Sequence, residues 1–217
     1  MNFNVAIDGP AGAGKSTIAQ LLGKRFNLMY INTGAMYRVV TFKALQNNIS
    51  ENDSEELIKL IDSLDMYFDG DNIIVNKEVF NDKITTPYIS NNVSKYAAMP
   101  VVREKLVKLQ NNMAHNYNVI MDGRDIGTVV LKNAEYKFYL TATPDARAKR
   151  RFEELISKNI KVVYEDILED IKKRDYKDIN RLLSPLKKAE DCIEVDSTNL
   201  NINEVVELMT TYITEKK

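Results

Sequence analysis

Short apolar runs alternate with longer amphipathic stretches along most of the chain. Runs of four or five apolar and β-branched residues that end at polar residues or glycine are typical of buried strands. Five such runs predict strands at residues 3–7, 28–31, 118–121, 136–140 and 192–195. The stretches between them space apolar residues as on one face of a helix, for example over residues 102–113. Strands that alternate with helices predict a parallel sheet with helices on both faces.

Two segments interrupt this alternation. Residues 62–90 contain three β-type runs around Asp-Gly-Asp and Asn-Lys turns, a pattern that predicts a small antiparallel insert. Residues 157–183 are highly charged and predict a mobile helical lid. The fold class expected from these patterns is α/β, with a five-stranded parallel sheet, a β insert and a helical lid.

Length and composition narrow the class of protein. The 217 residues, 44% of them hydrophobic, suffice for one domain with a sizeable core. Thirty basic and thirty-one acidic residues argue against a general nucleic-acid or membrane surface. A single cysteine and a single histidine exclude an internal disulfide and a cysteine or multi-histidine metal cluster. Without a signal-peptide pattern or an apolar run of about 20 residues, we expect a soluble, cytoplasmic monomer.

The arginines are unevenly distributed. The chain has only nine, against twenty-one lysines, and eight of the nine lie in five short segments. These are Arg38, Arg103, Arg124, Arg147, Arg150, Arg151, Arg174 and Arg181. Because arginine binds phosphate in a forked, bidentate manner, the clustering indicates an anion site built from distant segments. Surface ion pairs are the alternative explanation.

A phosphate-binding loop follows the first predicted strand. Its residues match the pattern G-x-x-x-x-G-K-[ST] in full: Gly9, Pro10, Ala11, Gly12, Ala13, Gly14, Lys15 and Ser16. The small residues allow backbone N–H groups to face a phosphate chain, next to the positive end of the following helix. Lys15 supplies a cation for the outer phosphates, and the Ser16 hydroxyl is a candidate ligand for Mg²⁺.

The loop alone does not separate hydrolases, switches and kinases. The guanine-reading pattern N-K-x-D is absent, since Val79 stands where its aspartate would be. After the strand at 118–121, Asp122 is followed by Arg124, so Asp122 could hold Mg²⁺ through water while Arg124 enters the same space. A cation there serves a second anion better than an attacking water, which favours a kinase. A local Asp–Arg turn is the alternative.

The remaining arginines lie on two predicted helices. Arg147, Arg150 and Arg151 follow Thr143 and Asp145, either of which could cap their helix. A role near the nucleotide and a solvated basic face both remain open for them. On the second helix, Arg174, Asp178 and Arg181 line one side. If that helix closes over the phosphate loop, it would bring cations to the transferred group and exclude water. A surface salt-bridge ladder is the alternative.

Together these segments resemble the bacterial cytidylate kinase family. The matching motifs, in order, are GPAGAGKST (9–17), NTGAMYR (32–38), VSKYAAMPVVREKL (93–106), DGRDIGT (122–128) and RDYKDINRLLSPL (174–186). The resemblance implies transfer of the γ-phosphoryl group of ATP to CMP or dCMP with Mg²⁺, on a three-layer P-loop fold. It divides the chain into a core (1–36, 97–156 and 184–217), a nucleoside-monophosphate-binding domain (37–96, with the insert at about 62–90) and a lid (157–183).

The resemblance also implies a role for individual residues. It assigns residues 9–16, with Thr17 and Arg150, to ATP, and Ser16 with Asp122 (through water) to Mg²⁺. It implies catalytic roles for Lys15, Arg124, Arg174 and Arg181. It assigns Thr33, Arg38, Ser94, Arg103, Arg124, Asp125, Arg174, Asp178 and Arg181 to the acceptor nucleotide. Within that set, Arg38 would bind the CMP phosphate, and Ser94 and Arg103 would read the cytosine edge beside Asp125.

Four positions depart from the family pattern, and two rival functions remain. Asn32 replaces the usual aspartate, Asn111 stands where arginine is common, and Lys177 and Ile179 stand where some members carry arginine. One rival is a P-loop kinase for another acceptor, such as AMP, UMP or shikimate. The other is an NTP-binding switch without turnover. The pair Ser94 and Arg103 argues against a sugar-acid acceptor, and the clustered arginines argue against a switch.

Overall fold

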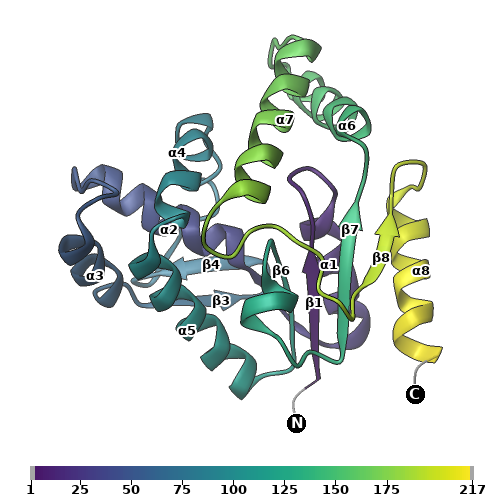
Figure 1. The fold of residues 1–217 in the computed structure, drawn as a ribbon, viewed down its shortest axis with the longest axis horizontal. Helices are drawn as coiled ribbons and strands as arrows, with labels where there is room; N and C mark the ends of the chain where they lie inside the picture. The colour runs from purple at the N-terminus through teal and green to yellow at the C-terminus, as the bar shows by residue number, and fades with distance from the viewer. Residues whose placement is uncertain (1–2, 216–217) are drawn as a thin grey trace.

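The main sheet is parallel throughout and matches the predicted strands. The computed structural model describes residues 3–215 (Figure 1). Within that range the sheet contains β1 (Asn4–Asp8), β2 (Met29–Asn32), β6 (Val119–Gly123), β7 (Tyr136–Thr141) and β8 (Ile193–Asp196), in the order β2-β6-β1-β7-β8. All four neighbouring pairs are parallel. The five predicted strands are thereby confirmed, with bounds that differ by one or two residues.

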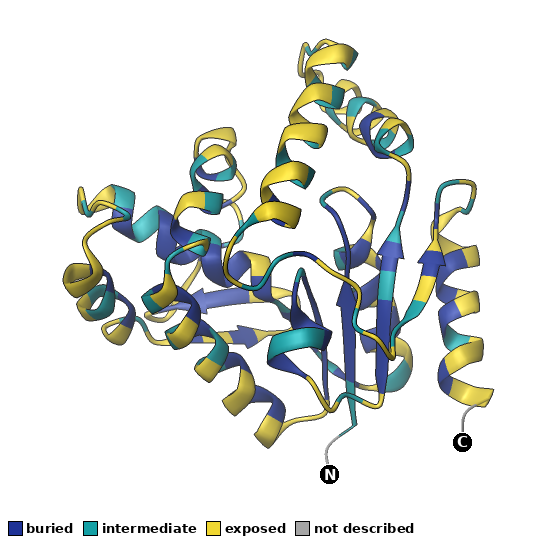
Figure 2. Cartoon of the chain, viewed as in Figure 1, coloured by how far each residue is buried: buried dark blue, intermediate teal, exposed yellow. Residues whose placement is uncertain are grey.

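Helices cover both faces of this sheet. On one face, Val5 and Ile7 of β1 pack with α1 (Lys15–Phe26) and α8 (Ile202–Glu215). On the other, Ala6 packs with α2 (Thr33–Gln46) and α5 (Pro100–Asn116). Since alternate residues of a strand point to opposite faces, both sides of β1 are buried, as the dark blue sheet in Figure 2 shows. The predicted three-layer α/β fold is confirmed.

The antiparallel insert forms as the sequence predicts, although it ends earlier. It consists of β3 (Met66–Asp69), β4 (Asn72–Val75) and β5 (Glu78–Val79) and packs beside α2 and α3 (Ser54–Asp62). Asn76 and Lys77 both have positive φ, 50° and 69°, as a tight two-residue hairpin turn requires. The expected boundary at residue 90 is wrong, because Thr86 caps α4 (Pro87–Ala97) and Pro87 starts it.

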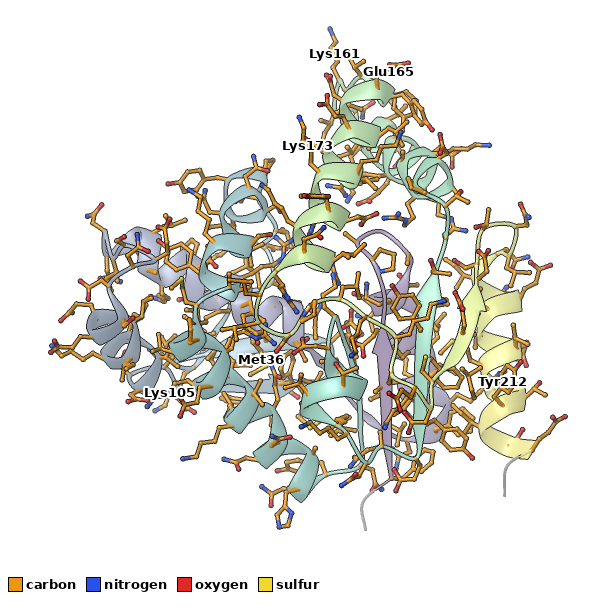
Figure 3. All side chains as sticks on the ribbon, in the orientation of Figure 1. Met36, Lys105, Lys161, Glu165, Lys173 and Tyr212 are labelled. Carbon is orange, nitrogen blue, oxygen red and sulfur yellow. The ribbon has the colours of Figure 1, made fainter. Side chains whose placement is uncertain are left out.

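Two helices, α6 (Pro144–Ser157) and α7 (Tyr164–Asn180), rise beyond the end of the sheet (Figure 1). Thr143, rather than Asp145, caps α6 by accepting a hydrogen bond from the Ala146 N–H. At the outer end of the pair, Lys161 and Glu165 point away from the core (Figure 3). Of the residues of α7, all of which the structure describes, Asp178 alone is buried. The helical prediction for this segment therefore holds, and polar contacts near its inner end attach α7 to the core.

Across residues 3–215, no helix combines the length and the apolar composition that a membrane span needs.

At its first residue, Gly9, the phosphate loop passes close to the backbone of β7. Gly9 has φ +149°, and a Cβ atom at this position would lie 2.0 Å from the Leu140 carbonyl oxygen of β7. No side chain fits there, because the obstructing atom belongs to a buried strand and cannot move aside. The loop can therefore leave β1 in this direction only with glycine at residue 9.

We expect Gly9→Ala to lower the free energy of unfolding by more than about 3 kcal/mol, because either the loop or β7 must shift. Gly70→Ala is the matched control: Gly70 also has positive φ, 55°, but a Cβ there meets nothing within 4 Å, so a loss of only about 1 kcal/mol is expected. Urea unfolding of both variants measures the difference. Equal losses would show that the contact with Leu140 is unimportant.

Candidate active site

The phosphate loop places a buried cation at the start of α1. Gly12 and Gly14 have positive φ, 76° and 90°, which lets the loop curl around the helix end. Lys15 is only 5% exposed, and its Nζ donates to the Pro10 carbonyl oxygen at 2.7 Å. Burial and the nearby Arg124 lower the pKa of Lys15 well below its usual value. An anion at this position would relieve both effects, so the site favours phosphate.

Asp122, at the carboxyl end of β6, joins the loop to β2. Its carboxylate accepts hydrogen bonds from the Ser16 hydroxyl at 2.9 Å and from the Tyr30 hydroxyl at 2.8 Å. Its carbonyl oxygen accepts one from the Thr33 hydroxyl at 2.6 Å. Ser16 and Asp122, which the sequence analysis pairs as Mg²⁺ ligands, therefore lie side by side. Tyr30 is a partner that the sequence analysis missed.

This oxygen pair suits a magnesium ion. Among residues 3–215, no group of three or more His, Cys, Asp and Glu side chains could hold a metal. Mg²⁺ does not need such a group, because it keeps several of its waters and binds through one or two protein oxygens and substrate phosphates. The hydroxyl of Ser16 and the carboxylate of Asp122 are of this kind.

A second carboxylate, missed by the sequence analysis, supports the segment after β6. Asp8 accepts hydrogen bonds from the N–H groups of Ile126 and Gly127, both at 2.8 Å, at the start of a single-turn π-helix, η1 (Ile126–Val130). Burial raises the pKa of Asp8 to about 6, although the two N–H groups act to lower it. The one signal in the sequence was its position at the end of a buried strand, directly before the phosphate loop.

A cavity of about 450 Å³ is lined by Arg124 and Arg174, two arginines close enough to Lys15 of the phosphate loop to lower its pKa. Its lining includes all nine residues that the resemblance assigns to the acceptor: Thr33, Arg38, Ser94, Arg103, Arg124, Asp125, Arg174, Asp178 and Arg181. They come from α2, α4, α5, the end of β6 and α7, so the fold brings together residues up to 148 positions apart. Tyr37, Asn91 and Lys177 also line it, and the sequence analysis had not assigned the first two a role.

Ion pairs hold the arginines of the cavity in place. Arg124 Nε lies 2.7 Å from Asp178 Oδ2. Arg103 pairs with Asp125, both almost fully buried, and its guanidinium lies over the Tyr37 ring at 5.6 Å from the ring centre. Burial alone would raise the pKa of Asp178, but the adjacent Arg124 lowers it below the usual value. The Asp178 carboxylate is therefore ionised at neutral pH, and the two ion pairs orient cations without removing the positive character of the cavity.

Two further arginines have spare capacity. Arg174 Nε is buried and has no hydrogen-bond partner among the described residues. Burial and the neighbouring Arg124 lower the pKa of Arg174 to about 10. Arg38 donates to the Ile84 carbonyl oxygen at 3.1 Å and to the Ser90 hydroxyl at 2.8 Å, and burial and Arg124 lower its pKa as well. Crowded cations, one of them with an unused buried donor, are the features expected of an anion site.

The three arginines of α6 lie in different surroundings. Arg151 is exposed and pairs with Glu154 at 2.7 Å. Arg150, assigned to ATP, donates to the Ser197 hydroxyl at 3.2 Å and to the Ser197 carbonyl oxygen, so it lies against the loop between β8 and α8. Thr17 is exposed on the first turn of α1. Arg147 is 2% exposed and donates to the Ala11 carbonyl oxygen of the phosphate loop, so it lies on neither a solvated face nor the cavity lining.

Comparison with known proteins agrees with this geometry. The profile of the cytidylate kinase family matches residues 5–215. A cytidylate kinase of Clostridium acetobutylicum is 60% identical over 216 residues, which cover 100% of both chains. The chain belongs to the cytidylate kinase family. Another member, from Clostridium perfringens, is 59% identical over 211 residues and 97% of each chain.

A solved structure shares the fold. The crystal structure of an uncharacterized protein from Eubacterium ventriosum superposes with a TM-score of 0.54 over 99% of each chain, at 14% sequence identity. At that identity the similarity concerns the fold alone.

The departure from the cytidylate kinase pattern at Asn32 leaves the N-terminal cap of α2 intact. Asn32 caps α2, and its side-chain oxygen accepts a hydrogen bond from the Ala35 N–H at 2.9 Å. Asparagine and aspartate cap helices about equally well. The start of α2, which carries Thr33 and Arg38, is therefore held in place despite the loss of a carboxylate.

Asp8 predicts an unusual dependence of stability on pH. Its pKa rises from 3.8 in the unfolded chain to about 6 in the fold, so the folded state keeps a proton that the unfolded state has lost. Between about pH 4 and pH 6 this group therefore makes the protein less stable as the pH rises, by about 3 kcal/mol in total. Below pH 4 the penalty is absent, and above pH 6 it is constant.

Urea unfolding of the protein and of Asp8→Asn across pH 4–7 measures this effect, because the variant has no carboxyl to titrate. The free energy of unfolding of the protein minus that of the variant should fall as the pH rises from 4 to 6. Curves that stay parallel over this range would contradict a raised pKa at Asp8.

Proposed function

We propose that this protein transfers the γ-phosphoryl group of ATP to CMP and dCMP, giving ADP with CDP or dCDP. The observation that carries the proposal is an arginine-rich cavity whose Arg124 and Arg174 also act on Lys15 of a complete phosphate loop. Membership of the cytidylate kinase family supports it. A hydrolase or switch needs only one nucleotide site. The cavity lined by arginines gives this protein a place for a second anionic substrate in addition to ATP.

Residues 9–17 would hold the ATP phosphates through the backbone N–H groups of all but Pro10, which has none, with Lys15 on the outer phosphates. Ser16 and Asp122 would hold Mg²⁺, which when bound neutralises charge on the β- and γ-phosphates. Arg124 lowers the pKa of Lys15 and forms an ion pair with Asp178. It would therefore act between the donor and acceptor sites. It would stabilise the charge that develops on the transferred group.

The acceptor would enter the cavity with its phosphate toward Arg124 and Arg38. An oxygen of the CMP phosphate attacks the γ-phosphorus, the bond from that phosphorus to the ADP oxygen breaks, and the electron pair leaves on ADP. The attacking oxygen is already anionic, so no general base is required. Catalysis then depends on in-line positioning and on cations, and Arg174 and Arg181 would supply further positive charge.

We assign recognition of the base to two further residues of the cavity lining. Ser94 and Arg103 would bind the carbonyl and ring nitrogen of cytosine, and Asp125 would hold Arg103 in place. Residues 37–96 would form the acceptor domain and residues 157–183 a lid that closes over both substrates. We expect a monomer, because one chain supplies both the phosphate loop and the cavity. We also expect the protein to act in the cytoplasm.

The first experiment measures ADP release from ATP and Mg²⁺ with no acceptor and then with CMP, dCMP, UMP, AMP, GMP or shikimate. We expect strong stimulation by CMP and dCMP, and its loss in Lys15→Ala, while exposed Lys24→Ala behaves as the parent protein does. Stimulation by another acceptor would keep the kinase and remove the cytosine assignment. ADP release that is indifferent to every acceptor would indicate an ATPase.

A milder change tests the base-reading role. Ser94→Ala removes one hydrogen-bonding group from the cavity and should raise the KM for CMP about tenfold, with the KM for ATP changed less than about twofold. Ser94 is preferable to Arg103, because truncating Arg103 would leave the buried Asp125 carboxylate with only Arg181 Nη2, 3.4 Å away.

Exposed Ser157 at the end of α6 is the matched control, and Ser157→Ala should change neither KM. An equal rise in both KM values of Ser94→Ala would remove this serine from base recognition.

A further inference from the structure

Arg147 is a buried arginine that contacts neither the acceptor cavity nor solvent. It is 2% exposed, and its guanidinium uses all three nitrogens. Nε donates to the Ala142 carbonyl oxygen at 2.9 Å, and Nη1 donates to the Ala11 carbonyl oxygen at 3.0 Å. Nη1 and Nη2 also bind the two carboxylate oxygens of Asp175 at 3.0 and 2.6 Å. A fork of this kind fixes the relative position of three segments.

Two of these segments belong to different working parts of the protein. Ala11 lies in the phosphate loop, and the Cβ of Arg147 lies 3.5 Å from where a Cβ on Gly12 would be, so Arg147 packs directly against the loop. Asp175 lies on α7. Because a buried guanidinium without a partner is unfavourable, the carboxylate of Asp175 stabilises Arg147 in this position, and α7 is thereby tied to the phosphate loop.

The same turn of α7 reaches the acceptor cavity. Arg174, the residue before Asp175, lines the cavity, and Asp178, three residues further, pairs with Arg124 at 2.7 Å. At its outer end α7 packs on α6 through the edge contact of Tyr164 with Phe152, whereas at this inner turn, where Asp178 is the one buried residue of the fully described helix, its contacts are polar. An element held in this way can move between discrete arrangements more easily than one packed in the core.

We propose that the Arg147–Asp175 pair couples the two substrate sites. Phosphates in the loop would fix the Ala11 backbone and with it Arg147, which through Asp175 holds the turn of α7 that presents Arg174 and Asp178 to the acceptor. Arg147 is then a positioning residue that touches neither substrate. The inference rests on the proposed function, since it requires ATP in the loop and CMP in the cavity. By linkage, CMP must strengthen ATP binding by the same factor that ATP strengthens CMP binding.

A merely structural pair would behave differently. It would lower the free energy of unfolding when removed but would leave the ratio of the two CMP affinities, with and without ATP, unchanged. The informative quantity is therefore this ratio, the coupling factor, rather than activity or stability.

The experiment is isothermal titration of CMP into the protein with and without a saturating non-hydrolysable ATP analogue and Mg²⁺. It is repeated with Asp175→Asn, Arg147→Lys and the double variant. Asp175→Asn keeps the size of the side chain, but the amide nitrogen that it introduces cannot accept a hydrogen bond. Arg147→Lys keeps the charge but not the fork. The matched controls break exposed pairs on or next to the same two helices: Glu169→Gln removes the partner of Lys173 on α7, and Lys158→Gln removes a partner of Glu154 at the end of α6.

We expect a coupling factor of about ten in the protein and in both controls, and a factor below about two in Asp175→Asn and Arg147→Lys. The double variant should lose no more coupling than either single variant, because the two residues act through one contact. If Arg147→Lys does not fold, Asp175→Asn with Glu169→Gln carries the test alone.

Two results would overturn the inference: a coupling factor near one in the unaltered protein, or an unchanged factor in Asp175→Asn. A protein that binds the ATP analogue but not CMP would instead refute the proposed function, and this inference with it. The same titrations therefore separate the two failures.

Discussion

Buried positive charges repel each other, and the structure depends on the carboxylates that pair with the arginines in and near the acceptor cavity. Arg103 is held by Asp125, Arg124 by Asp178 and Arg147 by Asp175. In each pair the carboxylate lies on a different element from its arginine, so the ion pairs also join α5 to the end of β6, the end of β6 to α7, and α6 to α7. The same ion pairs therefore set the charge distribution of the site and join the elements that form it.

These pairs differ from ordinary surface salt bridges in what they contribute. Buried ion pairs seldom add net stability, because desolvation of both groups offsets their attraction. Their effect here is geometric, since each holds a guanidinium at a set distance and direction. A cavity of neutral donors could be equally stable, but it would not attract two phosphorylated substrates and hold them in line.

The phosphate loop is positioned by backbone rather than by charge. Gly9 passes against the Leu140 carbonyl, Asp8 supports the start of η1, and Ser16 is joined to Asp122 across the edge of the sheet. Because β1, β6 and β7 are neighbouring parallel strands, their carboxyl ends meet at one edge, and every group that would handle ATP phosphates starts from that edge. The acceptor side is less rigidly attached, since α7 joins the core mainly through polar contacts.

Local patterns in the sequence determined the five parallel strands, the antiparallel insert and the phosphate loop, whereas the nine residues that line one cavity were expected from the motifs shared with the cytidylate kinase family. Such features depend on hydrophobic spacing and on ordered motifs, which can be read along the chain. Only the tertiary structure decided that Arg147 is buried while Arg151 is exposed, that Tyr30 holds Asp122, and that Asp8 supports η1. Each of these facts depends on a partner distant in the chain, 28 residues away for Arg147 and Asp175 and 118 for Asp8 and Ile126. A pattern read along the chain identifies candidates for such contacts, but packing in three dimensions selects the partner, because burial and charge are set by what surrounds a residue in space.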